Sequence, residues 1–97
     1  MTDIVTFTAS LWQMGGSWVF VTVPLDLSEA IRAIPRPPSP GFGSVKVSAT
    51  IGGSRWSTSI FPESASRCYV LPVKRPIRTA ENVGLGDAVV VQLELAE

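Results

Sequence analysis

The 97-residue sequence contains no histidine and only one cysteine, Cys68. Without histidine, the common structural and catalytic zinc sites cannot be assembled, and the most frequent general acid–base catalyst is missing. A lone cysteine cannot form an intrachain disulfide. The sequence therefore predicts no metal site and no cofactor, and it excludes histidine-dependent catalysis.

Long hydrophobic runs are also missing. The most extended uncharged apolar stretch, residues 11–23, is interrupted by Gln13 and two glycines, and it is shorter than the roughly 20 residues that cross a bilayer as a helix. The first ten residues alternate in polarity and carry Asp3 in place of a basic segment, which argues against a secretory signal. We therefore expect a cytoplasmic protein without a transmembrane segment.

Net charge is zero, but its distribution along the chain is uneven. All eight basic residues lie between residues 32 and 78, where Glu63 is the only acidic residue. Because folding brings the ends and the middle of a chain together, this asymmetry need not produce a basic patch in space. A neutral chain argues against nucleic-acid binding, since phosphate neutralisation supplies most of that affinity.

Alternation of apolar and polar residues is the dominant signal. Val5, Phe7, Ala9 and Leu11, for example, fall on one side of a strand that would bury that face. Residues 18–23 are apolar at nearly every position, which predicts a strand covered on both faces. Six strands are predicted, covering residues 4–12, 18–23, 45–51, 54–61, 68–73 and 88–95.

Glycine, proline and aspartate mark the corners between these strands. Gly52 and Gly53 predict a tight hairpin, and Gly86 with Asp87 predicts a sharp turn into the last strand. Pro24 should end the second strand, and Pro72 implies an edge or bulge position in the fifth.

Two short helices are predicted between the strands. Residues 25–34 have apolar residues at helical spacing, with Asp26 or Ser28 available as N-cap. Pro76 fits the first turn of a second helix that runs to about Asn82, since the N–H it lacks is not needed there.

The segment 35–43 holds four prolines and two glycines. Its composition predicts an irregular connection between helix and strand, with a proline-rich recognition motif as the alternative. The connection lies inside one domain, residues 4–95. With this spacing and no βαβ unit, the elements predict a mainly β fold: a small six-stranded barrel, closed or nearly closed, with one or two short capping helices.

Three stretches carry a resemblance to a known family: GGSWVFVTVP, VKVSATIGGSRWSTSIFP, and YVLPVKRPIR followed by LGDAVVVQLEL. Together they look like the small bacterial family called domain of unknown function 1905, which also occurs fused to bacteriocin-protection proteins. The resemblance covers residues 4–95. It implies a double-split, pseudo-symmetric barrel of the cradle-loop type, in which Leu85-Gly86-Asp87 matches a recurring Gly-Asp box, and it implies no particular activity.

The first functional hypothesis is a non-catalytic binding or accessory module for an anionic or planar small ligand or a protein partner. Basic and aromatic side chains together suit such ligands. The candidate site residues are Arg55, Trp56, Tyr69, Lys74, Arg75 and Arg78. In the alternative interpretation, the two aromatic residues belong to the core and the last three cations form a solvated helix face.

Two further hypotheses stay open. Analogy with transition-state regulators and antitoxins suggests a dimeric DNA-binding barrel, although fold analogy is a weak warrant. An enzyme would have to use Cys68, Tyr69 or a serine as nucleophile, with a lysine or carboxylate such as Lys74 or Asp87 as base. A buried, inert thiol and a turn aspartate are the simpler interpretations of Cys68 and Asp87. The apolar-rich composition makes a homo-oligomer possible.

Overall fold

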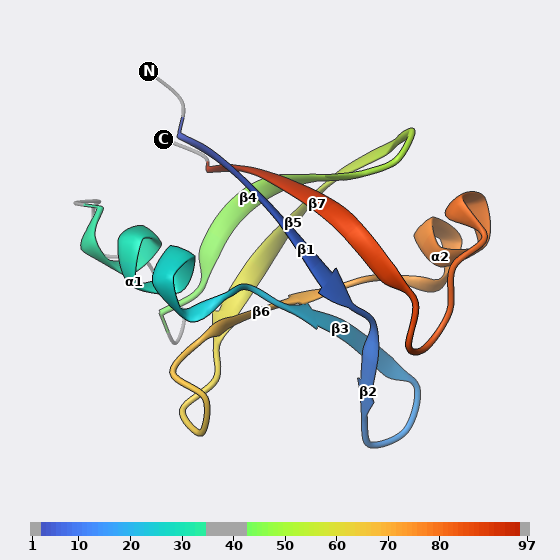
Figure 1. Ribbon diagram of the computed structural model, residues 1–97, viewed down its shortest axis with the longest axis horizontal. Coiled ribbons are helices and arrows are strands. Elements are labelled where there is room, and N and C mark those ends of the chain that lie inside the picture. The colour runs from blue at the N-terminus through green and yellow to red at the C-terminus, as the bar shows by residue number, and fades with distance from the viewer. Residues whose placement is uncertain (1–2, 35–42, 96–97) are drawn as a thin grey trace.

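The computed structural model of the chain describes residues 3–34 and 43–95. They form two helices and seven strands, which are joined in one antiparallel sheet of order β1-β7-β4-β5-β6-β3-β2 (Figure 1). The elements are β1 (Ile4–Ser10), β2 (Trp12–Met14), β3 (Trp18–Thr22), α1 (Leu25–Ala33), β4 (Val45–Ile51), β5 (Ser54–Pro62), β6 (Tyr69–Pro72), α2 (Arg75–Glu81) and β7 (Ala88–Leu95). The predicted mainly β class with two short helices is confirmed.

The strand number differs from the prediction because the first predicted strand divides at Leu11. β1 pairs with β7, whereas β2 pairs with β3. The backbone N–H of Leu11 donates to the carbonyl of Asp87 at 3.0 Å, and the N–H of Gly86 donates to the carbonyl of Leu11 at 2.9 Å. The turn before β7 therefore holds Leu11 at the point where the chain leaves one strand partner for another.

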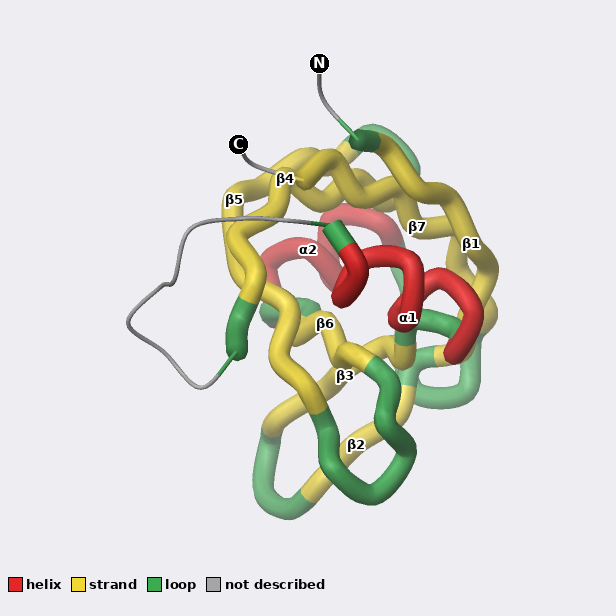
Figure 2. Tube along the Cα trace, turned by 90° about the vertical axis from the view of Figure 1, so that its left-hand side faces the viewer, coloured by secondary structure: helices red, strands yellow, loops and turns green. Residues whose placement is uncertain are grey.

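This division also sets the shape of the sheet. β1 and β2 are its two edge strands, yet only Leu11 separates them in the chain. The sheet must therefore curl until its two edges meet at that corner. Figure 2 shows the strands running around the centre of the view, with α1 in front. The fold is a curled half-barrel, and its sheet has seven strands where six were predicted.

The core fills the inside of the curl. Alternation places Val45, Val47, Ala49 and Ile51 of β4 inward, and all four are buried, as predicted. The inner faces of the other strands contribute in the same way. The side chains with no exposed surface include Val21, Ile60, Leu71, Val91 and Leu93.

One prediction for the strands was wrong. β3 is not covered on both faces: Val19 and Val21 are buried, whereas 63% of the Trp18 surface is exposed. Pro72 belongs to an inner strand, but β5 pairs with β6 only at Tyr69 and Val70, so Pro72 lies at a local edge, as predicted. Pro72 is tolerated as the last residue of its strand, where the next residue, Val73, donates its N–H to the carbonyl of Val19 at 2.9 Å.

The start of α1 differs from the predicted cap. The N-cap residue is Pro24, and no side chain caps the helix. Ser28 instead is fully buried: its hydroxyl donates to the carbonyl of Val23 and accepts the N–H of Tyr69, each at 3.0 Å. Ser28 therefore satisfies buried backbone groups between α1 and β6.

Helix α2 follows the prediction closely. Pro76 lies in its first turn, and Asn82 ends it in the left-handed conformation, with φ of 54°. The two helices lie at opposite ends of the curl, α1 at the left and α2 at the right of Figure 1. Neither is long and apolar enough to cross a bilayer. Of the predicted proline-rich connection, residues 35–42 lie outside the described residues.

Candidate functional site

Arg55 lies on the outer face of β5, apart from the core. Its guanidinium forms an ion pair with the carboxylate of Glu94 on β7, with Nη2 at 3.2 Å from Oε1 and from Oε2. More than half of the Arg55 side chain is exposed. The pairing with Glu94 gives Arg55 a role on the surface of the sheet without a ligand.

Trp56 and Tyr69 pack in or against the core. Tyr69 is only 2% exposed, and the guanidinium of Arg32 lies 5.4 Å from the centre of its ring. Trp56 packs on the core as a half-buried residue, and its indole N–H is buried without an acceptor among the described residues. Neither residue is among those that line the three cavities described below.

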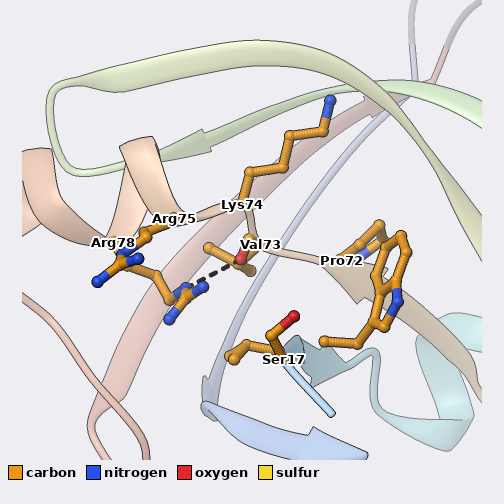
Figure 3. Close-up of a pocket in the computed structure, with 8 residues that line it drawn as sticks. Ser17, Pro72, Val73, Lys74, Arg75 and Arg78 are labelled. Atoms are coloured by element: carbon orange, nitrogen blue, oxygen red, sulfur yellow. Dashed lines mark hydrogen bonds between the residues drawn. The ribbon is translucent and has the colours of Figure 1, made fainter.

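The remaining three predicted residues, Lys74, Arg75 and Arg78, do come together at the start of α2. They line one side of a cavity of about 310 Å³, and the ends of β3 and β6 line the other. Figure 3 shows Lys74 extending away from the two arginines. The complete lining is Ser17, Trp18, Val19, Pro72, Val73, Lys74, Arg75 and Arg78.

Local structure fixes the two arginines on the same side of the helix. Positions three apart are neighbours on a helix surface, so Arg75 and Arg78 lie one above the other. The Nε–H of Arg78 donates to the carbonyl of Val73 at 3.1 Å, the dashed line in Figure 3. This bond holds the guanidinium against the end of β6 and leaves its two terminal nitrogens for a ligand.

The cavity is electrostatically one-sided. No acidic residue lines it, and within residues 3–34 and 43–95 no carboxylate forms an ion pair with Lys74, Arg75 or Arg78. Lys74 is the N-cap residue of α2 and Arg75 its first residue, so both cations lie at the unfavourable end of the helix dipole, whereas Arg78 lies in the last turn. An anion bound at Arg75 and Arg78 would offset the excess of positive charge here.

Trp18 is the site residue that the sequence analysis missed. It stacks on Phe20, with ring centroids 6.2 Å apart and planes 13° apart, and Phe20 also contacts Trp12 at 5.3 Å between centroids. Trp18 pairs with Met14 in the hairpin of β2 and β3. The sequence could have predicted the outward position of Trp18, because neighbouring residues of a strand point to opposite faces and Val19 points inward.

A second cavity of about 490 Å³ continues along α2. Arg75 and Arg78 line it too, together with residues of the turn before β7. Asp87 belongs to this turn, and its carboxylate accepts the N–H of Gly84 at 2.8 Å. The two arginines thus face both cavities, and the part of the space that Asp87 lines is the less favourable for an anion.

Cys68 is not arranged as a nucleophile. It is buried just before β6, and its thiol donates to the carbonyl of Ser66 at 3.6 Å. The geometry of Cys68 is that of a packed thiol.

Comparison with known proteins adds a family. A family model described as "Domain of unknown function (DUF1905)" matches residues 7–93, which is nearly the whole chain. No curated protein matches the sequence.

Proposed function

The chain belongs to the DUF1905 family, and we propose that it is a non-catalytic module that binds a planar, anionic small molecule. The observation that carries this proposal is the cavity in which Arg75 and Arg78, without carboxylate partners among the described residues, lie beside the exposed ring of Trp18. The site uses three residues of the sequence hypothesis, Lys74 included, and adds Trp18.

Two chemical features define the ligand. A guanidinium donates two parallel hydrogen bonds to a carboxylate or phosphate, which fixes both the charge and the orientation of the bound group. The indole of Trp18 offers a flat apolar surface, which suits an aromatic ring or another planar group. A cavity of about 310 Å³ falls at the lower end of the range for small-molecule sites.

The same proposal includes the setting of the module. We place it in the bacterial cytoplasm, as one domain that acts alone or as an accessory to a protein partner. We also assign its curled sheet to the double-split barrels, because the two edge strands meet at Leu11 and a helix lies at each end.

Titration with benzoate tests the site directly, since benzoate is both planar and anionic. In two-dimensional NMR of the ¹⁵N-labelled chain, we expect the indole N–H of Trp18 and the Nε–H of Arg78 to shift together. Arg78→Gln should weaken binding by about 10- to 100-fold, since a hydrogen bond to a charged group contributes about 1.5–3 kcal/mol.

Arg55→Gln is the matched control, because it removes an arginine whose ion pair with Glu94 lies on another part of the sheet. It should leave the benzoate affinity unchanged. Inorganic phosphate, which is anionic but not planar, should shift Arg78 without shifting Trp18. Equal losses in the Arg55 and Arg78 variants, or no shift at millimolar benzoate, would refute the proposed site.

A further inference from the structure

We propose that the natural ligand is an amphipathic anion, whose charged group binds at Arg75 and Arg78 and whose apolar chain lies in a groove on the outer face of β3, β6 and β5. This inference rests on the proposed function and extends it from the charged group to the rest of the ligand. The groove has a volume of about 590 Å³ and extends beyond the cavity that Arg75 and Arg78 line.

Exposed apolar side chains concentrate in this groove. Met14, Trp18 and Phe61 are 50%, 63% and 45% exposed, and all three line it. Most of the other lining residues are apolar too. The complete lining is Met14, Trp18, Phe20, Thr58, Phe61, Pro62, Glu63, Val70, Pro72 and Lys74. Contiguous apolar surface of this kind marks a place where the protein contacts something apolar.

The strand register explains why these side chains share a face. Met14 pairs with Trp18, Phe20 pairs with Pro72, and Phe61 pairs with Val70. Residues that are paired across antiparallel strands lie on the same face of a sheet. The apolar surface therefore runs without interruption from β2 to β5.

The groove is continuous with the cationic cavity. Trp18, Pro72 and Lys74 line both. A single molecule can thus place one end between the arginines and pass over the Trp18 ring into the groove. Neither an inorganic anion nor an uncharged hydrocarbon would use both parts.

Charge within the groove sets the direction of the ligand. Lys74 lies two residues after the end of β6, next to the cavity that Arg75 and Arg78 line. Glu63 lies at the other end of the strand, where its N–H donates to the carbonyl of Cys68 at 2.9 Å. An anionic group is attracted at the Lys74 end and repelled at the Glu63 end, so the chain must point from the arginines towards Glu63.

A series of straight-chain carboxylates tests the groove separately from the charged site. Hexanoate, octanoate and decanoate are titrated below their micelle concentrations and followed by the NMR signals of Trp18, Phe61 and Arg78. Each added pair of methylenes should raise the affinity about 4-fold if half buried and about 15-fold if fully buried. The decyltrimethylammonium cation should bind at least 10-fold more weakly than decanoate.

Variants on the two outer faces of the sheet provide matched controls. Phe61→Ser and Met14→Ser should each reduce the gain from hexanoate to decanoate while leaving benzoate binding intact. Val90→Ser removes an equally exposed apolar side chain from β7 and should change nothing. Thermal unfolding of each variant checks that the fold is retained.

Three outcomes would overturn this proposal. Affinity independent of chain length, with benzoate still bound, would refute the groove and leave the arginine site standing. Absence of binding by every carboxylate would refute both. A dimer in sedimentation experiments that Phe61→Ser dissociates would show that a second copy of the chain covers the groove.

Discussion

The two halves of the curled sheet have the same kind of inner face but opposite kinds of outer face. On β1, β7 and β4, the outward positions carry mainly small polar and charged side chains. These include Thr6, Thr8, Ser10, Lys46, Ser48, Thr50, Gln92 and Glu94. On β2, β3 and β6, the outward positions are mostly apolar, and four of them are aromatic or proline: Trp12, Trp18, Phe20 and Pro72.

Strand formation does not require this difference. Threonine and the aromatic residues are both favoured in strands, so either outer face would support the sheet. The core does not require it either, because both halves bury most of their inner side chains. On the apolar outer face, Trp18 and Met14 are exposed to water, and this exposure does not stabilise the fold. Interaction with a ligand is the explanation that we propose for it.

The largest expected effect tests whether the two inner faces form one core. Leu71 on β6 and Leu93 on β7 have no exposed surface. Truncation of either to alanine should lower the free energy of unfolding by about 2–5 kcal/mol, from lost burial and the cavity left behind. Urea unfolding followed by tryptophan fluorescence and by circular dichroism measures the change. If the two signals give two separate transitions, the two halves unfold independently. They would then not share one core, as the comparison of their outer faces assumes.

A smaller effect is expected where the polar half meets α2. Gly52, at the tip of the hairpin of β4 and β5, has φ of 57°, and a Cβ there would overlap the carboxylate of Glu81. This carboxylate accepts hydrogen bonds from the N–H of Gly53 and the hydroxyl of Ser54. Gly52→Ala should therefore destabilise the protein by about 1–3 kcal/mol.

Gly53→Ala is the control for that substitution, because no atom lies within 4 Å of its added Cβ. Thermal and urea unfolding of both variants should show a loss of stability for Gly52→Ala alone. Equal losses would mean that the hairpin tolerates no side chain at either position, and that the contact with Glu81 is not the cause.

The alternating pattern was enough to predict most strands, because inward positions in a half-buried sheet must be apolar. Apolar residues at helical spacing and the position of Pro76 predicted the two helices. The division at Leu11 could not be predicted, since Leu11 continues the alternation of β1 and only its partners in the turn before β7 reveal the change. The buried role of Ser28 was hidden for the same reason: its partner Tyr69 is 41 residues away.

For the candidate site, the sequence predicted the cations but not the aromatic residue. Lys74, Arg75 and Arg78 are close in the chain, so a short helix was enough to bring them together. Trp18 reaches them only through the pairing of β3 with β6. Arg55 and Tyr69 are of the same residue types as the site residues, but they lie elsewhere in the structure. Residue type alone does not reveal where a side chain lies.

The exposed apolar face should also differ from the polar face in its interaction with a hydrophobic dye. Phe61→Ser should reduce the fluorescence of bound anilinonaphthalene sulfonate by about half, because the dye is itself an amphipathic anion and the groove is its expected site. Val90→Ser, on the polar half, should leave the fluorescence unchanged although Val90 is 60% exposed. Equal reductions would show that isolated apolar residues bind the dye as well as the groove does. The two outer faces would then not differ in their interaction with apolar molecules.

The smallest effect is expected at the ion pair of Arg55 with Glu94 on the polar face. The two side chains are 58% and 28% exposed, and exposed pairs contribute about 0–1 kcal/mol because water and salt screen them. Arg55→Ala should therefore lower the free energy of unfolding by no more than about 0.5 kcal/mol, and 1 M NaCl should remove even that difference. A loss above about 2 kcal/mol in urea unfolding would mean that this face contributes to stability beyond its inner side chains. The outer face of the polar half would then have a structural role of its own, and it could not be used as the control for the apolar outer face.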